Sequence, residues 1–338
     1  MEDRARRLSV GMSKRPEKGA ECQRIRVTMS DMTDEQVRIG TRDVGHELWT
    51  SPITGYRRRG ARLAELRALL ATGITARAIF EPLRSCLADA PSVEMQRALR
   101  SRGFDVAGVQ QEPGGPVIGY VTADSLTEGA VRDHLLQIPL EKLTSDATTI
   151  ARLLSILKNQ PYVFVLSEQE VEGIVTRADL NKPAVRVYLF GLISLLEMHL
   201  GHWVKVTYGE SWQESLKPNR LEAAKKVQLL GQERKQDPPL LECLQFGDRR
   251  DLVAARPELL AKLCLGTKSE ARHRLREAEC LRDLLAHSHR DLASGSDWEQ
   301  IIGMVETVER VVQKSDECVE DDARVLVQRD QDGLWPSA

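Results

Sequence analysis

A weak internal repeat in the middle of the sequence constrains the fold more than any other feature. VIGYVTADSL, residues 117–126, and VEGIVTRADL, residues 171–180, align so that Gly119 corresponds to Gly173. Before each of them the sequence has a helix-like stretch, an apolar run and a short polar turn. Apolar runs bounded by Pro, Gly and acidic residues are typical of β-hairpins. The repeat therefore predicts two successive units, each with a helix, a strand, a turn, a second strand and the start of a further helix.

The segments GYVTADSL and GIVTRADL, together with the helix–hairpin repeat over roughly 73–183, resemble a tandem pair of CBS domains. In that family a strand ending in Gly-x-x-Thr, followed by an Asp at the next helix, commonly holds the ribose and phosphate of an adenine nucleotide. The resemblance implies that Thr176 and Asp179 bind AMP, ADP or ATP, and that Thr122 is the counterpart of Thr176 in the first copy. A hydroxyl and helix N-terminal amides suit phosphate, and a carboxylate accepts hydrogen bonds from both ribose hydroxyls.

The first copy departs from this pattern, because Ser125 stands where the second copy has Asp179. We therefore expect one good adenosine site in the pair. Two alternatives remain open: the pair serves mainly as a dimerisation scaffold, or Asp179 only caps the helix that follows it.

From about residue 184 the sequence predicts helices. The first of them, in residues 181–206, contains an apolar run that is flanked by charged residues and is too short to span a bilayer, so we expect a buried helix and no membrane partner. Apolar residues recur with a helical period as far as about residue 324, and Ser296-x-x-Glu299 is a capping box for the last helix. The short connections predict an antiparallel bundle.

These patterns divide the chain into four segments and predict an α+β protein. Residues 1–45 are expected to be a flexible leader, 46–183 the tandem CBS-like regulatory domain, 184–324 the helical domain and 325–338 an irregular tail. The net charge of −2 excludes a global basic field, so RNA contact would need a local patch. The six cysteines have no CxxC spacing, which argues against a zinc knuckle and favours reduced thiols in the cytoplasm.

The stretch LRDLLAHSH, residues 281–289, lies near the end of the penultimate predicted helix. Asp283 and His287 are four residues apart, so on a helix the carboxylate would accept a hydrogen bond from the imidazole and orient it. A guanidinium such as that of Arg282 neutralises charge on a phosphodiester, while an imidazole moves protons. RNA supplies its own 2′-hydroxyl nucleophile, so this chemistry needs no metal ion, and we expect no metal site.

This motif, and the helical region of roughly 183–324 around it, resemble the HEPN superfamily of all-α domains. The resemblance implies a metal-independent ribonuclease that acts as a homodimer, with Arg282 on the scissile phosphate, Asp283 beside it and His287 or His289 as the acid/base. Glu197, on the first helix of the bundle, is the candidate for a supporting acidic residue.

The sequence therefore predicts an endoribonuclease of HEPN type that is regulated by an adenine nucleotide bound to the CBS pair, with a role in growth arrest or anti-phage defence. The alternative is a non-enzymatic nucleotide-sensing scaffold whose helical domain binds RNA or a protein partner.

Overall fold

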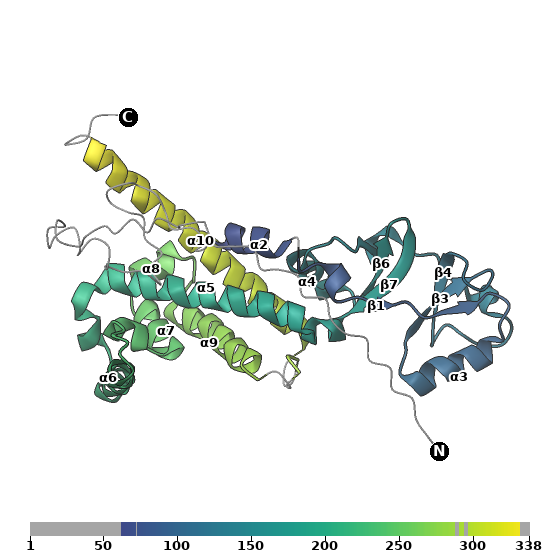
Figure 1. The fold of residues 1–338 in the computed structure, drawn as a ribbon, viewed down its shortest axis with the longest axis horizontal. Coiled ribbons are helices and arrows are strands. Elements are labelled where there is room, and N and C mark those ends of the chain that lie inside the picture. The colour runs from purple at the N-terminus through teal and green to yellow at the C-terminus, as the bar shows by residue number, and fades with distance from the viewer. Residues whose placement is uncertain (1–61, 72, 288–290, 294–296, 332–338) are drawn as a thin grey trace, which may run out of the picture. The chain divides into compact units, whose positions relative to one another are not determined.

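The computed structural model of the chain describes residues 62–331 except 72, 288–290 and 294–296. All of these residues lie in one compact unit that covers His46–Ala338. After one helix, two small sheets follow along the chain and then a helical part (Figure 1), so the fold is α+β with a helical C-terminal portion. The predicted leader, residues 1–45, lies outside the described residues.

Both copies of the repeat form a unit in which a strand, a helix and a hairpin follow one another. In each unit the first strand pairs in parallel with the second, and the second pairs antiparallel with the third. The first repeat unit (residues 85–126) contains β2 (Ser85–Leu87), α3 (Ser92–Arg102), β3 (Val106–Gln110) and β4 (Val117–Thr122). The second repeat unit (residues 143–180) contains β5 (Leu143–Ser145), α4 (Ile150–Asn159), β6 (Tyr162–Ser167) and β7 (Glu170–Thr176).

The chain segment that precedes each unit crosses to the sheet of the other unit. Strand β1 (Glu81–Pro82) pairs antiparallel with β7 of the second unit, and a Cβ on Gly173 would lie 2.2 Å from the ring of Phe80. In the first unit a Cβ on Gly119 would lie 2.6 Å from a side-chain carbon and from a carbonyl oxygen of residues 135–136. Glycine therefore stands at both positions because the crossing chain leaves no room for a side chain.

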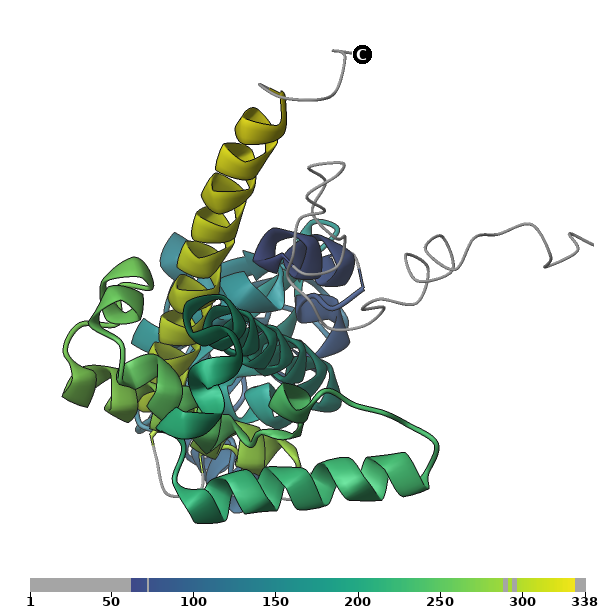
Figure 2. The same cartoon turned by 90° about the vertical axis from the view of Figure 1, so that its left-hand side faces the viewer.

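The helical part is built around α5 (Pro183–Tyr208), which packs against four other helices. The helices of this part, including one that precedes the repeat, are α2 (Leu63–Ala71), α5, α6 (Pro218–Glu233), α7 (Phe246–Ala254), α8 (Pro257–Lys262), α9 (Lys268–Leu285) and α10 (Trp298–Gln331). Figure 2 shows α6 running beside this bundle, where it packs against the short helix at Leu240–Cys243. Helix α2, which the sequence placed with residues 46–183, packs against α5 and α10.

Helix α5 begins at Pro183, whose fixed φ and missing N–H suit the first helical position. By length and composition alone it is apolar enough to cross a membrane, and half of its apolar window is buried inside the protein. Leu189, Leu192 and Leu196 lie in a core that continues into the second repeat unit, whereas the first unit has a core of its own. The second unit and the helical part are therefore held together by one continuous apolar interior.

The last helix differs from the expectation at both ends. It begins at Trp298, and Asp297 caps it by accepting a hydrogen bond from the N–H of Gln300 at 2.7 Å. The predicted capping residue, Ser296, lies outside the described residues. The helix continues to Gln331, so the irregular tail that the sequence predicted from residue 325 does not begin there.

Candidate functional site

The end of β7 brings Thr176 and Asp179 together. A turn of 3-10 helix, Arg177–Asn181, follows the strand, and Asp179 occupies its third position. One carboxylate oxygen of Asp179, Oδ2, accepts hydrogen bonds from the N–H of Thr176 at 2.7 Å and from its hydroxyl at 2.8 Å. Asp179 is buried. The side chain therefore caps the turn, as one of the two sequence-based alternatives proposed, and the other oxygen is engaged elsewhere.

That other oxygen, Oδ1, lies 2.9 Å from the ammonium of Lys182. The same ammonium donates to the carbonyl oxygen of Ile79 at 2.5 Å and to the carboxylate of Glu81. Lys182 thus joins the end of β7 to the segment that crosses over from the first unit. Burial lowers the pKa of Lys182, but its hydrogen bonds with Glu81 and Asp179 outweigh burial, so the pKa is raised above its ordinary value.

In the corresponding turn of the first unit the hydroxyl of Ser125 stands where the carboxylate of Asp179 caps the second turn, and Asp124 in the same turn is exposed. The N–H of Thr122 donates to Ser125 Oγ at 3.0 Å, and the N–H of Ser125 donates to Thr122 Oγ1 at 3.1 Å. In both turns the first and fourth residues are hydrogen-bonded to each other, but only in the second turn is one of them a carboxylate. A cation or a ribose diol finds a buried carboxylate at the second turn, whereas the carboxylate of the first turn, Asp124, is exposed.

Three charged side chains converge in the helical part from three different helices. Glu197 on α5 lies 3.4 Å from Arg282 on α9 and 3.9 Å from Arg249 on α7. Burial lowers the pKa of Arg249 from its ordinary value, with Glu197 as the largest opposing influence. Within the described residues, Arg249 Nε has no hydrogen-bond partner. Two guanidiniums thus face one shared carboxylate, and guanidinium groups are suited to bind an anion such as a phosphodiester.

Sequence reasoning named Glu197 and Arg282 but missed Arg249. The only local signal was the pair of arginines at 249–250, which is common on exposed helix faces. Arg249 joins the cluster because α7 packs on α5 and α9, a relation that no short-range pattern contains.

The other residues of the predicted motif lie near the end of α9. The helix ends at Leu285 with Ala286 as its C-cap, so His287 follows the last helical residue and is exposed. Asp283 is also exposed and lies 3.6 Å from the guanidinium of Arg282. The orientation of His287 by Asp283 stays a prediction, and His289 lies outside the described residues.

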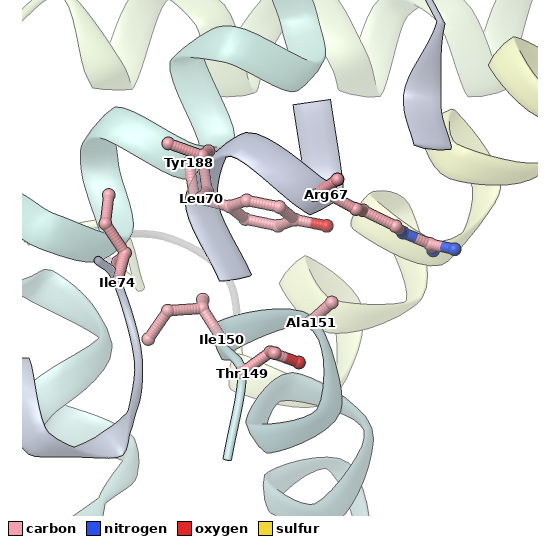
Figure 3. A pocket seen from close by; sticks show the side chains of 8 residues that line it. Arg67, Leu70, Ile74, Thr149, Ile150, Ala151 and Tyr188 are labelled. Carbon is pink, nitrogen blue, oxygen red and sulfur yellow. The ribbon is translucent and has the colours of Figure 1, made fainter. Parts of the chain in front are cut away.

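A cavity of about 200 Å³ lies where α2, the start of α4 and α5 meet (Figure 3). Its lining is mostly apolar, and Figure 3 shows the hydroxyl of Tyr188 and the guanidinium of Arg67 on one side of it. Arg67 donates to Glu309 at 2.6 Å, and the Tyr188 hydroxyl donates to the same carboxylate. The polar edge of the cavity is therefore already satisfied by α10.

Among the residues that the structure describes, no group of three or more His, Cys, Asp or Glu side chains is arranged to hold a metal ion.

No protein-family model matches the sequence, and none of the curated proteins compared with it shows significant similarity. Among solved structures, 62 chains match. The CBS domain of the bacterial CNNM/CorC family Mg²⁺ transporter in complex with ATP is 16% identical over 35% of this chain and 92% of its own, with a TM-score of 0.29. CBSX2 in complex with AMP is 16% identical over 34% and 98%, with a TM-score of 0.30.

CBSX2 from Arabidopsis thaliana, a CBS-pair protein, is 19% identical over 34% of this chain and 97% of its own, with a TM-score of 0.29. Identities and TM-scores of this size carry no conclusion about ligand or activity. The functional proposals below depend on the geometry of this chain.

Proposed function

We propose that this protein senses an adenine nucleotide, which binds at the turn after β7 between Thr176, Asp179 and the crossing segment at 79–81. The observation that supports this is the convergence of a buried carboxylate, a hydroxyl and the ammonium of Lys182 at one strand end. A carboxylate accepts from the two hydroxyls of a ribose, and an ammonium pairs with a phosphate. AMP, ADP and ATP all carry a ribose with two hydroxyls and at least one phosphate.

In the nucleotide-bound state, Lys182 exchanges partners. Its ammonium leaves Asp179 Oδ1 for the phosphate, and this oxygen becomes available to the ribose. The carboxylate keeps its two hydrogen bonds from Thr176 on Oδ2. The exchange replaces an ion pair within the protein by one with the ligand, so its net free energy is modest and reversible binding is expected.

Calorimetric titration of the full chain with AMP and with ATP tests this proposal. Asp179→Asn keeps the shape of the capping side chain and is expected to weaken binding at least about tenfold, the value of one lost charge-assisted hydrogen bond. Asp124→Asn is the matched control, because Asp124 is an exposed carboxylate in the equivalent turn of the first unit. An absence of binding by the wild type at millimolar nucleotide, or equal weakening by both variants, would overturn the proposal.

A second candidate function is RNA cleavage at the end of α9, and the convergence of Arg249 and Arg282 on Glu197 favours it. In this reaction Arg282 binds the scissile phosphate, and His287 or His289 takes the proton from the 2′-hydroxyl and protonates the leaving oxygen. Such an enzyme would act as a homodimer without a metal ion. The role in growth arrest or anti-phage defence belongs to this candidate alone.

Incubation of end-labelled total RNA with the purified protein in EDTA distinguishes the two functional classes. Cleavage that is lost in Arg282→Ala and in His287→Ala, but is retained in Arg276→Ala, supports the nuclease. Arg276 is exposed on the same helix and lies outside the cluster. No cleavage by the wild type, with or without adenine nucleotides, supports the scaffold that binds RNA or a protein partner.

A further inference from the structure

Six residues, 181–186, connect the turn after β7 to the end of α9. They contain the last residue of the 3-10 turn, Lys182, and the first turn of α5. On one side, Lys182 contacts Asp179, Glu81 and the carbonyl of Ile79. The candidate nucleotide site therefore includes a residue of this connecting segment.

On the other side, Asn181 holds the segment that follows α9. Its side-chain oxygen accepts a hydrogen bond from the N–H of Leu292 at 2.8 Å, and its amide nitrogen donates to Asp291 Oδ1 at 2.9 Å. Leu292 is fully buried. One asparagine side chain thus satisfies a backbone donor and a carboxylate more than a hundred residues away in the chain.

Arg186, one turn into α5, holds the end of α9 itself. Its guanidinium donates to the carbonyl oxygens of Leu284 and His287, at 3.4 Å each, and to the carbonyl oxygen of Asn181 at 3.2 Å. The carbonyl of Leu284 belongs to the last turn of α9, and that of His287 belongs to the candidate acid/base residue. The position of His287 relative to Arg282 therefore depends on where the start of α5 lies.

The backbone between these contacts is stiff. Pro183 fixes its own φ and restricts Lys182 before it, which has φ −63° and ψ 149°. Lys182 N–H also donates to the carbonyl of Asp179 at 3.0 Å, and its carbonyl accepts from the N–H of Arg186 at 3.2 Å. A displacement of the Lys182 backbone has few dihedral angles to absorb it, so Asn181 and Arg186 move with it.

We propose that Asn181–Arg186 is a coupling element, in which Lys182 responds to the nucleotide while Asn181 and Arg186 position the end of α9. The inference rests on the proposed nucleotide site and deepens it, because it names how that site regulates the helical part. When a phosphate draws Lys182 away from Asp179 and Glu81, the start of α5 shifts. The hydrogen bonds from Asn181 and Arg186 to residues 284–292 then weaken, and His287 moves relative to Arg282. Arg186 is a positioning residue in this scheme, since it acts through His287.

Amide hydrogen exchange in the ligand-free full chain tests the coupling directly, because the N–H of Leu292 is the donor to Asn181. Asn181→Ala removes this acceptor, so its exchange rate at Leu292 is the reference for complete loss of the hydrogen bond. Lys182→Gln is expected to raise the exchange rate of Leu292 by about threefold or more, although Lys182 does not touch it. Lys182→Arg, which keeps the charge, is expected to restore most of the protection, a rescue that simple disruption of packing would not give.

Lys158→Gln is the matched control. Lys158 forms an ion pair with Glu306 at 2.6 Å, which also joins the second repeat unit to the helical part, but the partner lies on α10 and not on the connecting segment. The coupling is refuted if Lys182→Gln leaves the exchange of Leu292 as in the wild type, or if Lys158→Gln raises it equally. A thermal melt of each variant verifies that the change is local.

Addition of AMP separates this inference from the proposed function. If AMP binds and raises the exchange of Leu292 as Lys182→Gln does, both stand. If AMP binds and leaves Leu292 unchanged, the coupling fails and nucleotide binding survives. If AMP does not bind, the proposed function fails, and the comparison of Lys182→Gln with wild type still decides whether the segment couples the two sites.

Discussion

Substitution of Gly173 by alanine tests the crossed arrangement of the repeat units. The added Cβ would lie 2.2 Å from one carbon of the Phe80 ring and 2.9 Å from two others. Since carbon atoms in ordinary contact are about 3.5–4.0 Å apart, the ring or β7 must shift by about an ångström. Overpacking of this kind costs about 1–3 kcal/mol. This cost exceeds the opposing stabilisation of a few tenths to 1 kcal/mol that alanine gives over glycine by restricting the unfolded chain.

A melting curve followed by circular dichroism measures this cost, and each kcal/mol lowers the Tm of a protein of this size by about 1–2 °C. Gly73→Ala is the control, because a Cβ there meets no atom within 4 Å. Phe80→Ala in the Gly173→Ala background should recover part of the loss from the collision, since it removes the ring atoms that collide. Equal melting temperatures for Gly173→Ala and Gly73→Ala would refute the crossed packing.

The loss of stability in Gly119→Ala should not be recovered by truncating the side chain that its Cβ meets. Its Cβ would lie 2.6 Å from the backbone carbonyl of Leu136 as well as from the Leu135 side chain. Truncation of Leu135 therefore leaves the backbone collision in place, and the double variant is expected to melt no higher than Gly119→Ala. Recovery by Leu135→Ala would show that the backbone is free to retreat.

Three further predictions concern single side chains. Tyr188→Phe removes a buried hydroxyl that donates to a carboxylate of α10 and should cost about 1–2 kcal/mol in chemical denaturation. The hydrogen bond from Arg77 lowers the pKa of Asp146 from its ordinary value of 3.8. This carboxylate therefore stabilises the folded protein above pH 3.8, and the stabilisation is lost as the pH falls below that value. Asp146→Asn should make the Tm depend less on pH in this acidic range. Burial raises the pKa of the Cys243 thiol, so iodoacetamide near neutral pH should alkylate exposed Cys264 well before it, as peptide mass spectrometry would report.

Some residues of the candidate sites could be identified from their neighbours in the sequence, and others only from contacts between distant parts of the chain. Thr176 and Asp179 could be found from the sequence because they are three residues apart, and a turn after a strand brings such residues together whatever surrounds them. Lys182 is equally close, but its importance comes from Glu81 and Ile79, about a hundred residues away. Arg282 was identifiable within its motif, whereas the partners Glu197 and Arg249 depend on how three helices pack.

The sequence by itself determined two helix–hairpin units and the helices that follow, because periodicity, turns and caps act over two to four residues. It also determined that Asp179 has Ser125 as its counterpart in the first unit. It did not predict the short strands β2 and β5 that precede the helices of these units. Only the tertiary structure decided that the segment before each unit crosses to the other sheet, and that α10 and α2 close over α5. It also decided that Asn181, Lys182 and Arg186 lie between the two candidate sites. Those contacts join residues far apart in the chain, so they depend on which apolar faces can be buried together, and a local pattern does not contain that information.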